Sequence, residues 1–187
     1  FAPSRLYFTY YHAVEVDGLD PPQGPQQGRT LVAIRGRGFV QSESLKCKFA
    51  TVVVDAVFVS STMLNCTAPA LPAGAVALEV SNNAVDFSRS NVTFTYISVV
   101  TLLQLSPPAG PHRGNTIVSV LGTGILPGST CQFGGAPAQA ASFVSGTELR
   151  CLSPSQPRGT YPVEITSNMQ DFTAQRLEYT YHEQWSV

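Results

Sequence analysis

The pattern of hydrophobic and polar positions repeats along the chain, and its most regular segment occurs three times. The three copies are residues 1–10 (FAPSRLYFTY), 87–96 (FSRSNVTFTY) and 172–181 (FTAQRLEYTY). Apolar side chains alternate with polar ones near the end of each copy, as at Val92, Phe94 and Tyr96, which is typical of a strand with one buried face. The last tyrosine returns at positions 10, 96 and 181, at intervals of 86 and 85 residues. The sequence therefore predicts an array of similar modules.

The segments between these copies also recur in the same order. A Pro-Pro-x-Gly-Pro-x-x-Gly skeleton occurs at residues 21–28 and 107–114. Because proline fixes φ and glycine permits positive φ, this skeleton predicts a shaped turn and excludes a central strand. The strands expected around it are residues 30–35, 45–49, 52–59 and 74–81, and their counterparts 116–121, 130–133, 136–144 and 159–166.

No stretch of ten or more residues has a helical period, so each module is expected to be an all-β sandwich of about seven short strands. The predicted boundaries are residues 11–97 (module 1) and 98–182 (module 2). Residues 1–10 are interpreted as the closing strand of a preceding repeat and residues 183–187 as the start of a linker. The joint between the modules has only residues 97–99 and no glycine or proline, so it is expected to restrict the angle between them.

The predicted strands in both modules end in Gly-x-Gly, at Gly36 and Gly38 and at Gly122 and Gly124. Such a pair can belong to a phosphate-binding loop, but no helix-forming run follows to supply the amide groups that would bind an anion. A bulge or a turn is the preferred interpretation.

Charge argues against nucleic acid and anionic membranes as partners. Charged residues make up 12% of the chain and the net charge is −1. The residues that come closest to forming a basic patch are Lys46, Lys48, Arg35 and Arg37. They are interpreted as a solvated group and not as a nucleic-acid site. No apolar run reaches the roughly 18 residues of a membrane span, and the N-terminus lacks a signal-peptide pattern, so any leader or anchor is expected outside this chain.

Four cysteines occur two per module, Cys47 with Cys66 and Cys131 with Cys151. They allow three pairings, and the repeat favours the two bonds within modules. Disulfide bonds persist in oxidising compartments, so this pairing indicates a location outside the cytosol. The alternative is that the four cysteines are two pairs of buried free thiols. Zinc is not expected because no Cys-x-x-Cys or nearby histidine completes a ligand set.

Two Asn-x-Ser/Thr tripeptides are candidate N-glycosylation sites. Asn91 is expected to point outward together with Thr93, because Val92, Phe94 and Tyr96 face inward by alternation. Asn65 adjoins Cys66, so disulfide formation could compete with its modification.

No catalytic or metal site is predicted. The twelve carboxylates are scattered, and His12, His112 and His182 are not at metal-ligand spacing and are interpreted as solvated. Asp86 and Asp171 recur at matched positions, where capping of a turn is preferred over calcium binding. The chain is therefore expected to be neither an enzyme nor the holder of a cofactor.

The ordered pattern resembles the IPT/TIG immunoglobulin-like domain family, in its plexin-like and fibrocystin-like surface members. In module 2 the residues that carry it are Pro108, Pro111, Gly114, Thr116, Gly122, Gly124, Cys131, Leu149, Cys151, Pro154, Gly159 and residues 172–181. In module 1 they are Pro22, Pro25, Gly28, Thr30, Gly36, Gly38, Cys47, Leu64, Cys66, Pro69, Gly74 and residues 87–96. The cysteine spacing is too short for the inter-sheet bond of an antibody domain, and no tryptophan lies between the pair, which favours IPT/TIG over an ordinary immunoglobulin domain.

The resemblance implies two tandem immunoglobulin-like β-sandwiches that serve as a non-catalytic structural or adhesion module. They would belong to a longer array on a cell-surface or matrix glycoprotein, with another protein or further copies as partners and with N-linked glycans. Two alternatives follow from other family members. One is a carbohydrate-binding accessory role through exposed aromatics such as Tyr7, Tyr11 or Trp185, and the other is Rel-type DNA binding, which the few basic residues disfavour.

Overall fold

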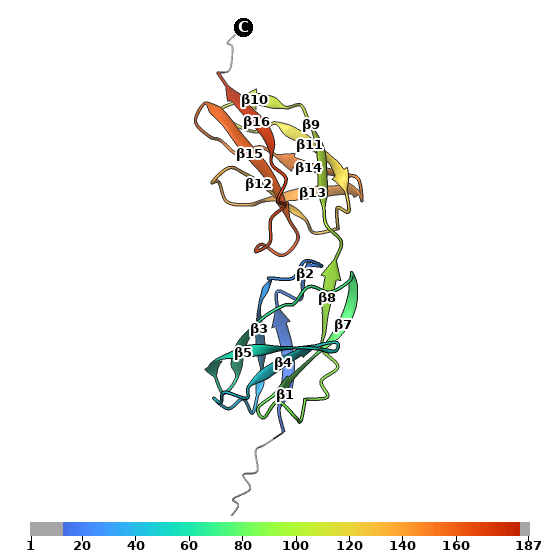
Figure 1. Ribbon diagram of the computed structural model, residues 1–187. Coiled ribbons are helices and arrows are strands. Elements are labelled where there is room, and N and C mark those ends of the chain that lie inside the picture. Colours follow the sequence, from blue (N-terminus) through green and yellow to red (C-terminus); the bar gives the residue numbers. More distant parts are fainter. Residues whose placement is uncertain (1–12, 184–187) are drawn as a thin grey trace, which may run out of the picture. The chain divides into compact units, whose positions relative to one another are not determined.

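The computed structural model describes residues 13–183, which form sixteen β-strands and no helix (Figure 1). Module 1 contains β1 (Glu15–Asp20), β2 (Gln23–Pro25), β3 (Leu31–Arg37), β4 (Lys46–Phe49), β5 (Val52–Ser60), β6 (Met63–Thr67), β7 (Gly74–Ser81) and β8 (Thr93–Ile97). Module 2 contains β9 (Thr101–Ser106), β10 (Ala109–Pro111), β11 (Ile117–Thr123), β12 (Thr130–Phe133), β13 (Gln139–Ser145), β14 (Glu148–Leu152), β15 (Gly159–Thr166) and β16 (Leu177–His182). The predicted strand at residues 1–10 lies outside the described residues.

Interresidue contacts divide the chain into two compact units, the first ending at Thr95 and the second beginning at Tyr96, with Gln23–Gln26 grouped in the second. Within residues 13–183 no segment forms the long apolar helix that would be needed to cross a membrane.

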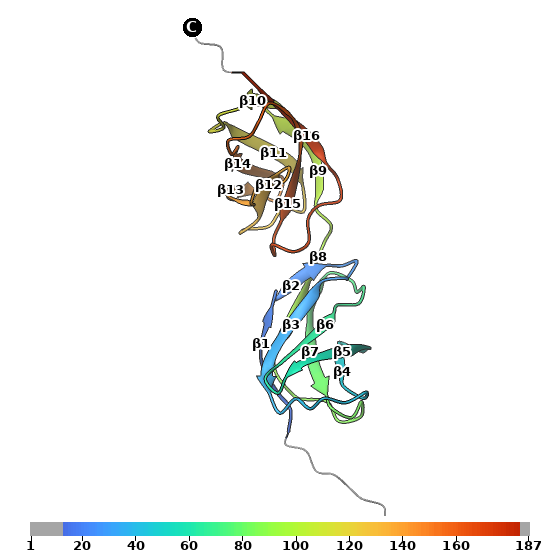
Figure 2. The same cartoon turned by 90° about the vertical axis from the view of Figure 1, so that its left-hand side faces the viewer.

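Both modules have the same strand order, which confirms the predicted all-β class and the tandem repeat. In module 1 the order of neighbouring strands is β1-β3-β6-β5-β4-β7-β8-β2, and in module 2 it is β9-β11-β14-β13-β12-β15-β16-β10. The first half of β5 pairs with β4 and its second half pairs with β6, so β5 passes from one layer of the sandwich to the other. β13 does the same between β12 and β14 (Figure 2).

Each module has eight strands instead of the predicted seven because the proline-rich skeleton contains a short strand. β2 and β10 have three residues each and stand at one end of the strand order. β10 runs parallel to β16, with Pro111 opposite His182. Proline is tolerated there because an edge strand needs hydrogen bonds on one side only. The skeleton is still excluded from the central strands, as its prolines predict.

The closing strands are shorter than the sequence predicts, since β8 begins at Thr93 and β16 at Leu177. Upstream of β8, the Ser88 amide donates to the Val80 carbonyl (2.8 Å), and the Val80 amide donates to the Ser88 hydroxyl (3.0 Å). Thr173 makes the same two bonds with Ile165 in module 2. In each module a side-chain hydroxyl replaces a backbone carbonyl as the acceptor of one of these two bonds. The segment that contains Ser88 or Thr173 is therefore not part of the regular backbone ladder of the closing strand.

A buried apolar core fills each sandwich. The module 1 core consists of Val16, Val32, Ile34, Phe39, Leu45, Cys47, Phe49, Leu64, Cys66, Ala68, Leu78, Val80, Phe94 and Tyr96. The module 2 core consists of Leu102, Leu105, Val118, Val120, Ile125, Cys131, Phe133, Leu149, Cys151, Val163, Ile165, Tyr179 and Tyr181. Phe49 meets Phe94 edge to face at 5.5 Å between ring centroids, and Phe133 meets Tyr179 in the same way at 5.4 Å. The alternating aromatics of the closing strands are therefore buried, as the pattern predicts.

The Gly-x-Gly segments are a strand end followed by a turn. Gly36 pairs with Val16 in a β1–β3 ladder whose register shifts between Val16 and Gly18, and a Cβ on Gly36 would overlap the Glu15 carbonyl oxygen. Gly38, two residues later, has a φ of 79°. Gly122 and Gly124 have the same close approach and positive φ in module 2. The structure thus has the bulge and turn that were preferred over a phosphate loop.

Alkaline pH is expected to destabilise both modules. Burial raises the pKa of Tyr96 and that of Tyr181 to about 12. Below pH 10 the phenol is neutral in both the folded and the unfolded chain, so its contribution to the free energy of unfolding is fully present. Between pH 10 and 12 the phenol ionises only in the unfolded chain, which stabilises the unfolded state. The free energy of unfolding of each module should therefore fall by about 3 kcal/mol across that window, measured by urea titration at a series of pH values.

The matched control for this pH dependence is Tyr181→Phe, which removes from module 2 the phenol whose pKa is raised to about 12 and leaves Tyr96 in module 1. The variant should show a smaller loss of module 2 stability between pH 10 and 12. Equal urea midpoints from pH 9 to pH 12 in the unmodified chain would contradict the prediction.

Candidate interaction and modification surfaces

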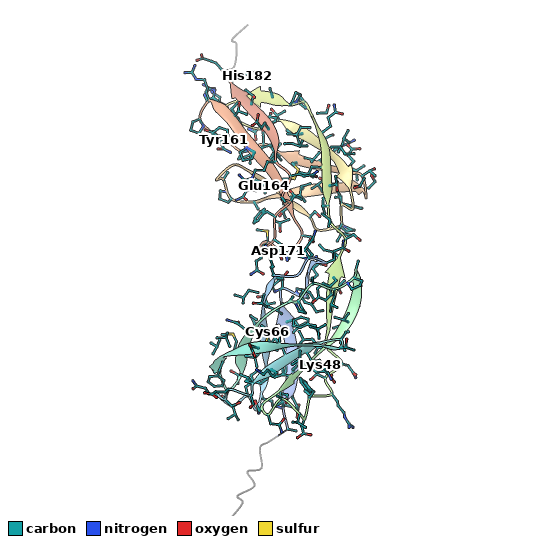
Figure 3. All side chains as sticks on the ribbon, viewed as in Figure 1. Lys48, Cys66, Tyr161, Glu164, Asp171 and His182 are labelled. Carbon is teal, nitrogen blue, oxygen red and sulfur yellow. A yellow bond between two sulfur atoms is a disulfide. The ribbon has the colours of Figure 1, made fainter. Side chains whose placement is uncertain are left out.

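Two disulfides join the layers of the sandwiches. Cys47 on β4 is bonded to Cys66 on β6 with 6.5 Å between their Cα atoms, and Cys131 on β12 is bonded to Cys151 on β14 with 6.1 Å between theirs. All four side chains are buried (Cys66 is labelled in Figure 3). Both bonds lie within modules, which is the pairing that the repeat favours, and no free cysteine remains.

Each bond spans the strand that changes layers. Cys47 lies opposite Val54 in the β4–β5 ladder, and Cys66 lies opposite Ala56 in the β5–β6 ladder. The cysteine spacing is shorter than that of the inter-sheet bond in an antibody domain, yet each bond still joins two layers. Because β5 crosses between the sheets, its neighbours β4 and β6 belong to different layers although their cysteines are 19 residues apart.

Asn65 lies near the centre of the outer side of the β3–β6–β5 layer. Its backbone is opposite Ala33 of β3 on one side and Val57 of β5 on the other. Leu64 and Cys66 are buried, whereas Asn65 is half-buried and Thr67 is exposed, so the asparagine and the threonine of the tripeptide share the outer face. The strand geometry thus presents both residues to solvent.

Exposed apolar side chains surround Asn65. Leu31 on β3 is 46% exposed, Val57 and Val59 on β5 are 64% and 45% exposed, and Met63 on β6 is 36% exposed. We call this group, with Asn65, the module 1 outer face. Single exposed apolar residues are common on protein surfaces. A cluster of them, in contrast, often marks a surface that a partner or ligand covers.

The corresponding face of module 2 has a different centre. Arg150 replaces Asn65, and its Nε donates to Glu148 Oε1 at 3.0 Å, while the Ser119 hydroxyl donates to the same oxygen at 3.0 Å. The hydrogen bond from Arg150 lowers the pKa of the Glu148 carboxyl. At one end of the face Ile117 (64% exposed) lies opposite Leu152 (47% exposed). We call these five residues the module 2 outer face.

Asn91 is in a different setting. It is exposed and precedes β8, with Val92 half-buried and Thr93 exposed. None of the residues 87–93 is a strongly exposed large apolar side chain. The predicted outward orientation of Asn91 and Thr93 agrees with this exposure pattern.

The basic residues that could suggest nucleic-acid binding are each close to a carboxylate. Lys46 pairs with Asp55, Lys48 with Glu79, Arg37 with Glu15, and Arg35 with Asp20 at 3.9 Å. The Lys48 ammonium also lies 4.5 Å from the centroid of the Phe87 ring. These pairs leave little unbalanced positive charge on module 1 for a phosphate backbone.

Asp86 and Asp171 close matched turns. The Asn83 side-chain amide donates to Asp86 Oδ2 (2.9 Å), and its oxygen accepts from the Asp86 backbone amide (2.8 Å). Asn168 makes the same pair of bonds with Asp171 at 2.7 Å and 2.8 Å (Asp171 is labelled in Figure 3). These contacts fit the turn-capping interpretation.

The structure brings no metal-binding group together in the range it describes. Residues 13–183 contain no cluster of three or more His, Cys, Asp or Glu side chains arranged to hold an ion. His182 is exposed as expected, whereas His112 is half-buried, and its backbone amide donates to the His182 carbonyl (2.8 Å). His12 and the aromatics Tyr7, Tyr11 and Trp185 are outside the described residues.

Sequence reasoning missed the two outer faces. The signal was the almost continuous apolar run at residues 52–59, in which Val53, Val57 and Val59 occupy the positions that alternate with the inward ones. In a sheet with one face exposed to solvent, the outward positions of a strand are ordinarily polar. Unexplained apolar residues at outward strand positions are thus the pattern that could have located these surfaces.

Comparison with known proteins gives consistent results. A family model described as IPT/TIG domain matches residues 15–96 and 101–181. Plexin-A3 of Homo sapiens is 28% identical over 197 residues, covering 90% of this chain and 10% of its own length. Fibrocystin-L of Mus musculus is 26% identical over 168 residues, covering 88% of this chain and 4% of its own length. The chain therefore spans a tenth or less of these two relatives.

Among solved structures, the full extracellular region of Plexin A4 matches with a TM-score of 0.57 and 23% sequence identity. The match covers 91% of this chain and 16% of the Plexin A4 chain. At this identity the similarity is one of fold.

Proposed function

Because this chain belongs to the IPT/TIG domain family, we propose that it is a non-catalytic part of an extracellular array that binds other proteins. Residues 11–97 and 98–182 are the two modules, residues 1–10 close a preceding repeat, and residues 183–187 begin a linker. The third copy of the closing-strand pattern, at residues 1–10, supports a longer array on a cell-surface or matrix glycoprotein.

Two observations support a location outside the cytosol. Both modules contain a buried disulfide, and disulfides persist in oxidising compartments. The sequence is also similar to Plexin-A3 and Fibrocystin-L, and a structure with the same fold is described as a plexin extracellular region.

A non-catalytic role is supported by the contacts of the acidic side chains, which are in ion pairs or in turns. Asp20, Glu15, Asp55 and Glu79 are in ion pairs, and Asp86 and Asp171 close turns. A general acid and base would need two such groups placed around one substrate site. The polar side chains therefore fit a scaffold better than an active site.

The observation that carries the binding role is the module 2 outer face. Ile117 and Leu152 lie side by side on neighbouring strands, are largely exposed, and border the ion pair of Glu148 with Arg150. Exposed apolar side chains next to charged ones are typical of protein interfaces, and a disulfide-bonded sheet holds this group in a fixed shape.

A cell-binding experiment tests this role. The chain is fused to a multimerising tag, and its binding to intact animal cells is measured by flow cytometry. Because a partner on this face would bury the apolar pair, Ile117→Lys with Leu152→Lys should lower binding by about tenfold or more. The matched control is Glu178→Lys on β16, which changes the net charge by the same amount at an exposed position of the other layer.

Treatment of the cells distinguishes the partner classes. Binding that is lost after protease treatment and retained after glycosidase treatment agrees with a protein partner. Binding that is lost after glycosidase treatment alone would favour the carbohydrate-binding alternative. Equal binding of the lysine variant and the unmodified chain would contradict the assignment of this face.

A further inference from the structure

We propose that an N-linked glycan on Asn65 covers the module 1 outer face and replaces a protein partner there. The proposal rests on the extracellular location proposed above, and it gives the two outer faces different roles. Module 2 would present its face to a partner, whereas module 1 would have its face covered by a sugar chain that this protein carries itself.

The first support is the placement of the acceptor. Asn65 and Thr67 lie two residues apart on one strand and share its outer face, while Cys66 points into the core. Within residues 13–183 the Asn65 side chain makes no hydrogen bond to another residue, in contrast to Asn82, Asn83 and Asn168, which are all bonded. The residues directly opposite it on the neighbouring strands are Ala33 and Val57, so no long side chain stands directly across from the amide.

The second support is the chemistry of the surrounding surface. Leu31, Val57, Val59 and Met63 expose apolar atoms around a single amide. A pyranose ring has an apolar side made of C–H groups, and burial of apolar surface between ring and protein removes both from water. The first sugars of a chain on Asn65 would lie within reach of these side chains, because they are attached at the centre of the group.

The third support is the comparison between the two modules. In module 2 the position of Asn65 is taken by Arg150, whose ion pair with Glu148 and neighbour Ser119 occupies the centre of the face. Module 1 has no charged side chain at that centre, and its apolar residues extend over three strands. The same position thus holds a charged side chain with its own partner in module 2 and, within residues 13–183, an uncharged amide without one in module 1.

The modification is a group transfer from a lipid-linked oligosaccharide. The Asn65 amide nitrogen forms a bond to the anomeric carbon of the first sugar and loses one proton. The bond between that carbon and a phosphate oxygen breaks, and a polyprenyl diphosphate leaves. Since β6 is paired on both sides, with β3 and β5, the transfer must precede the pairing of this strand.

The test uses the full chain secreted from animal cells behind a cleavable signal peptide. Peptide mass spectrometry measures occupancy of Asn65 and Asn91, and the fluorescence of an added dye that binds to apolar surface (ANS) reports how much of that surface is exposed. We expect Asn65 to be occupied and dye fluorescence to be low. Removal of glycans from the folded protein by an amidase should raise the fluorescence several-fold and lower the melting temperature by about 4 °C.

Asn91→Gln is the matched control, because it removes a sugar chain from a segment without strongly exposed apolar side chains. Asn65→Gln should reproduce the increase in dye fluorescence, and Asn91→Gln should not. In the Asn65→Gln background, Val57→Thr with Met63→Gln should reduce the fluorescence again. If Asn65→Gln is not secreted, the amidase-treated unmodified chain still gives the comparison.

An unoccupied Asn65 would overturn the proposal, and so would equal dye fluorescence in the Asn65→Gln and Asn91→Gln proteins. Neither outcome changes the cell-binding test, because that test depends on Ile117 and Leu152 in the other module. Loss of cell binding by the lysine variant with an unoccupied Asn65 would therefore leave the proposed function in place and remove only this inference.

Discussion

Gly114→Ala is expected to lower the free energy of unfolding of module 2 by about 3 kcal/mol or more, which is a large part of the stability of a small domain. Gly114 has a φ of 78°, and a Cβ there would lie 2.6 Å from the carbonyl carbon of Pro154. The substitution therefore combines a strained backbone with an overlap that only a backbone shift can relieve. Hydrogen exchange followed by mass spectrometry would locate the loss in module 2 peptides.

Gly135→Ala is the control, because it is in the same module and a Cβ there would meet no atom within 4 Å. It should change stability by about 0.5 kcal/mol or less. Gly28→Ala should lower the free energy of unfolding of module 1 by a similarly large amount. Gly28 has a φ of 72°, and a Cβ there would lie 2.5 Å from the Ala68 carbonyl oxygen. Unchanged exchange in the Gly114→Ala protein would mean that the proline-rich turn and the segment at Pro154 do not pack as described.

Replacement of Cys131 and Cys151 by alanine is expected to cost module 2 about 3 kcal/mol. The bond closes a loop with a sequence separation of 20, and its loss frees the unfolded chain by about that amount in the chain-entropy model. The bond also ties β12 to β14 across the strand that changes layers, so its removal should loosen β13 in particular. Faster amide exchange in β13 than in β15 would be the corresponding observation.

The internal control for this variant is module 1, whose Cys47–Cys66 bond is untouched and whose exchange should stay the same. Reduction of the unmodified chain should destabilise both modules and raise the mass by about 4 Da, which is two hydrogens for each of the two bonds. A Cys131→Ala, Cys151→Ala protein with unchanged urea midpoint would show that the β13 crossover is held by its hydrogen bonds and by the core alone.

Much of the fold could be predicted because local physics and the repeat agree. The alternation at Phe94 and Tyr96 identifies buried strand positions, and the same positions recur at Tyr179 and Tyr181. The layer change of β5 could not be predicted, because it depends on which strands pair and not on the pattern within the strand. The late start of the closing strands could not be predicted either, because in module 1 it depends on the hydrogen bonds of the Ser88 hydroxyl and amide with Val80, which form only in the folded chain.

The candidate surfaces were predicted less completely than the fold. Asn65 and Asn91 can be found from a three-residue pattern, but the apolar surroundings of Asn65 come from three strands that are separated in sequence. Similarly, Ile117 and Leu152 are 35 residues apart and become neighbours only through the β11–β14 register. Alternation assigns each residue to a face, but it does not tell which residues of other strands share that face.

The strand order has a consequence for the folding of a long array. Each module is one continuous ladder that ends at β1 and β2, or at β9 and β10, and these are the strands with unpaired backbone groups. β2 and β10 have three residues and a proline, and the register of β1 and β9 shifts within their ladders. Short, interrupted edges are poor templates for another strand. In a chain of similar modules held close together by short joints, such edges oppose strand exchange between neighbours while the array folds.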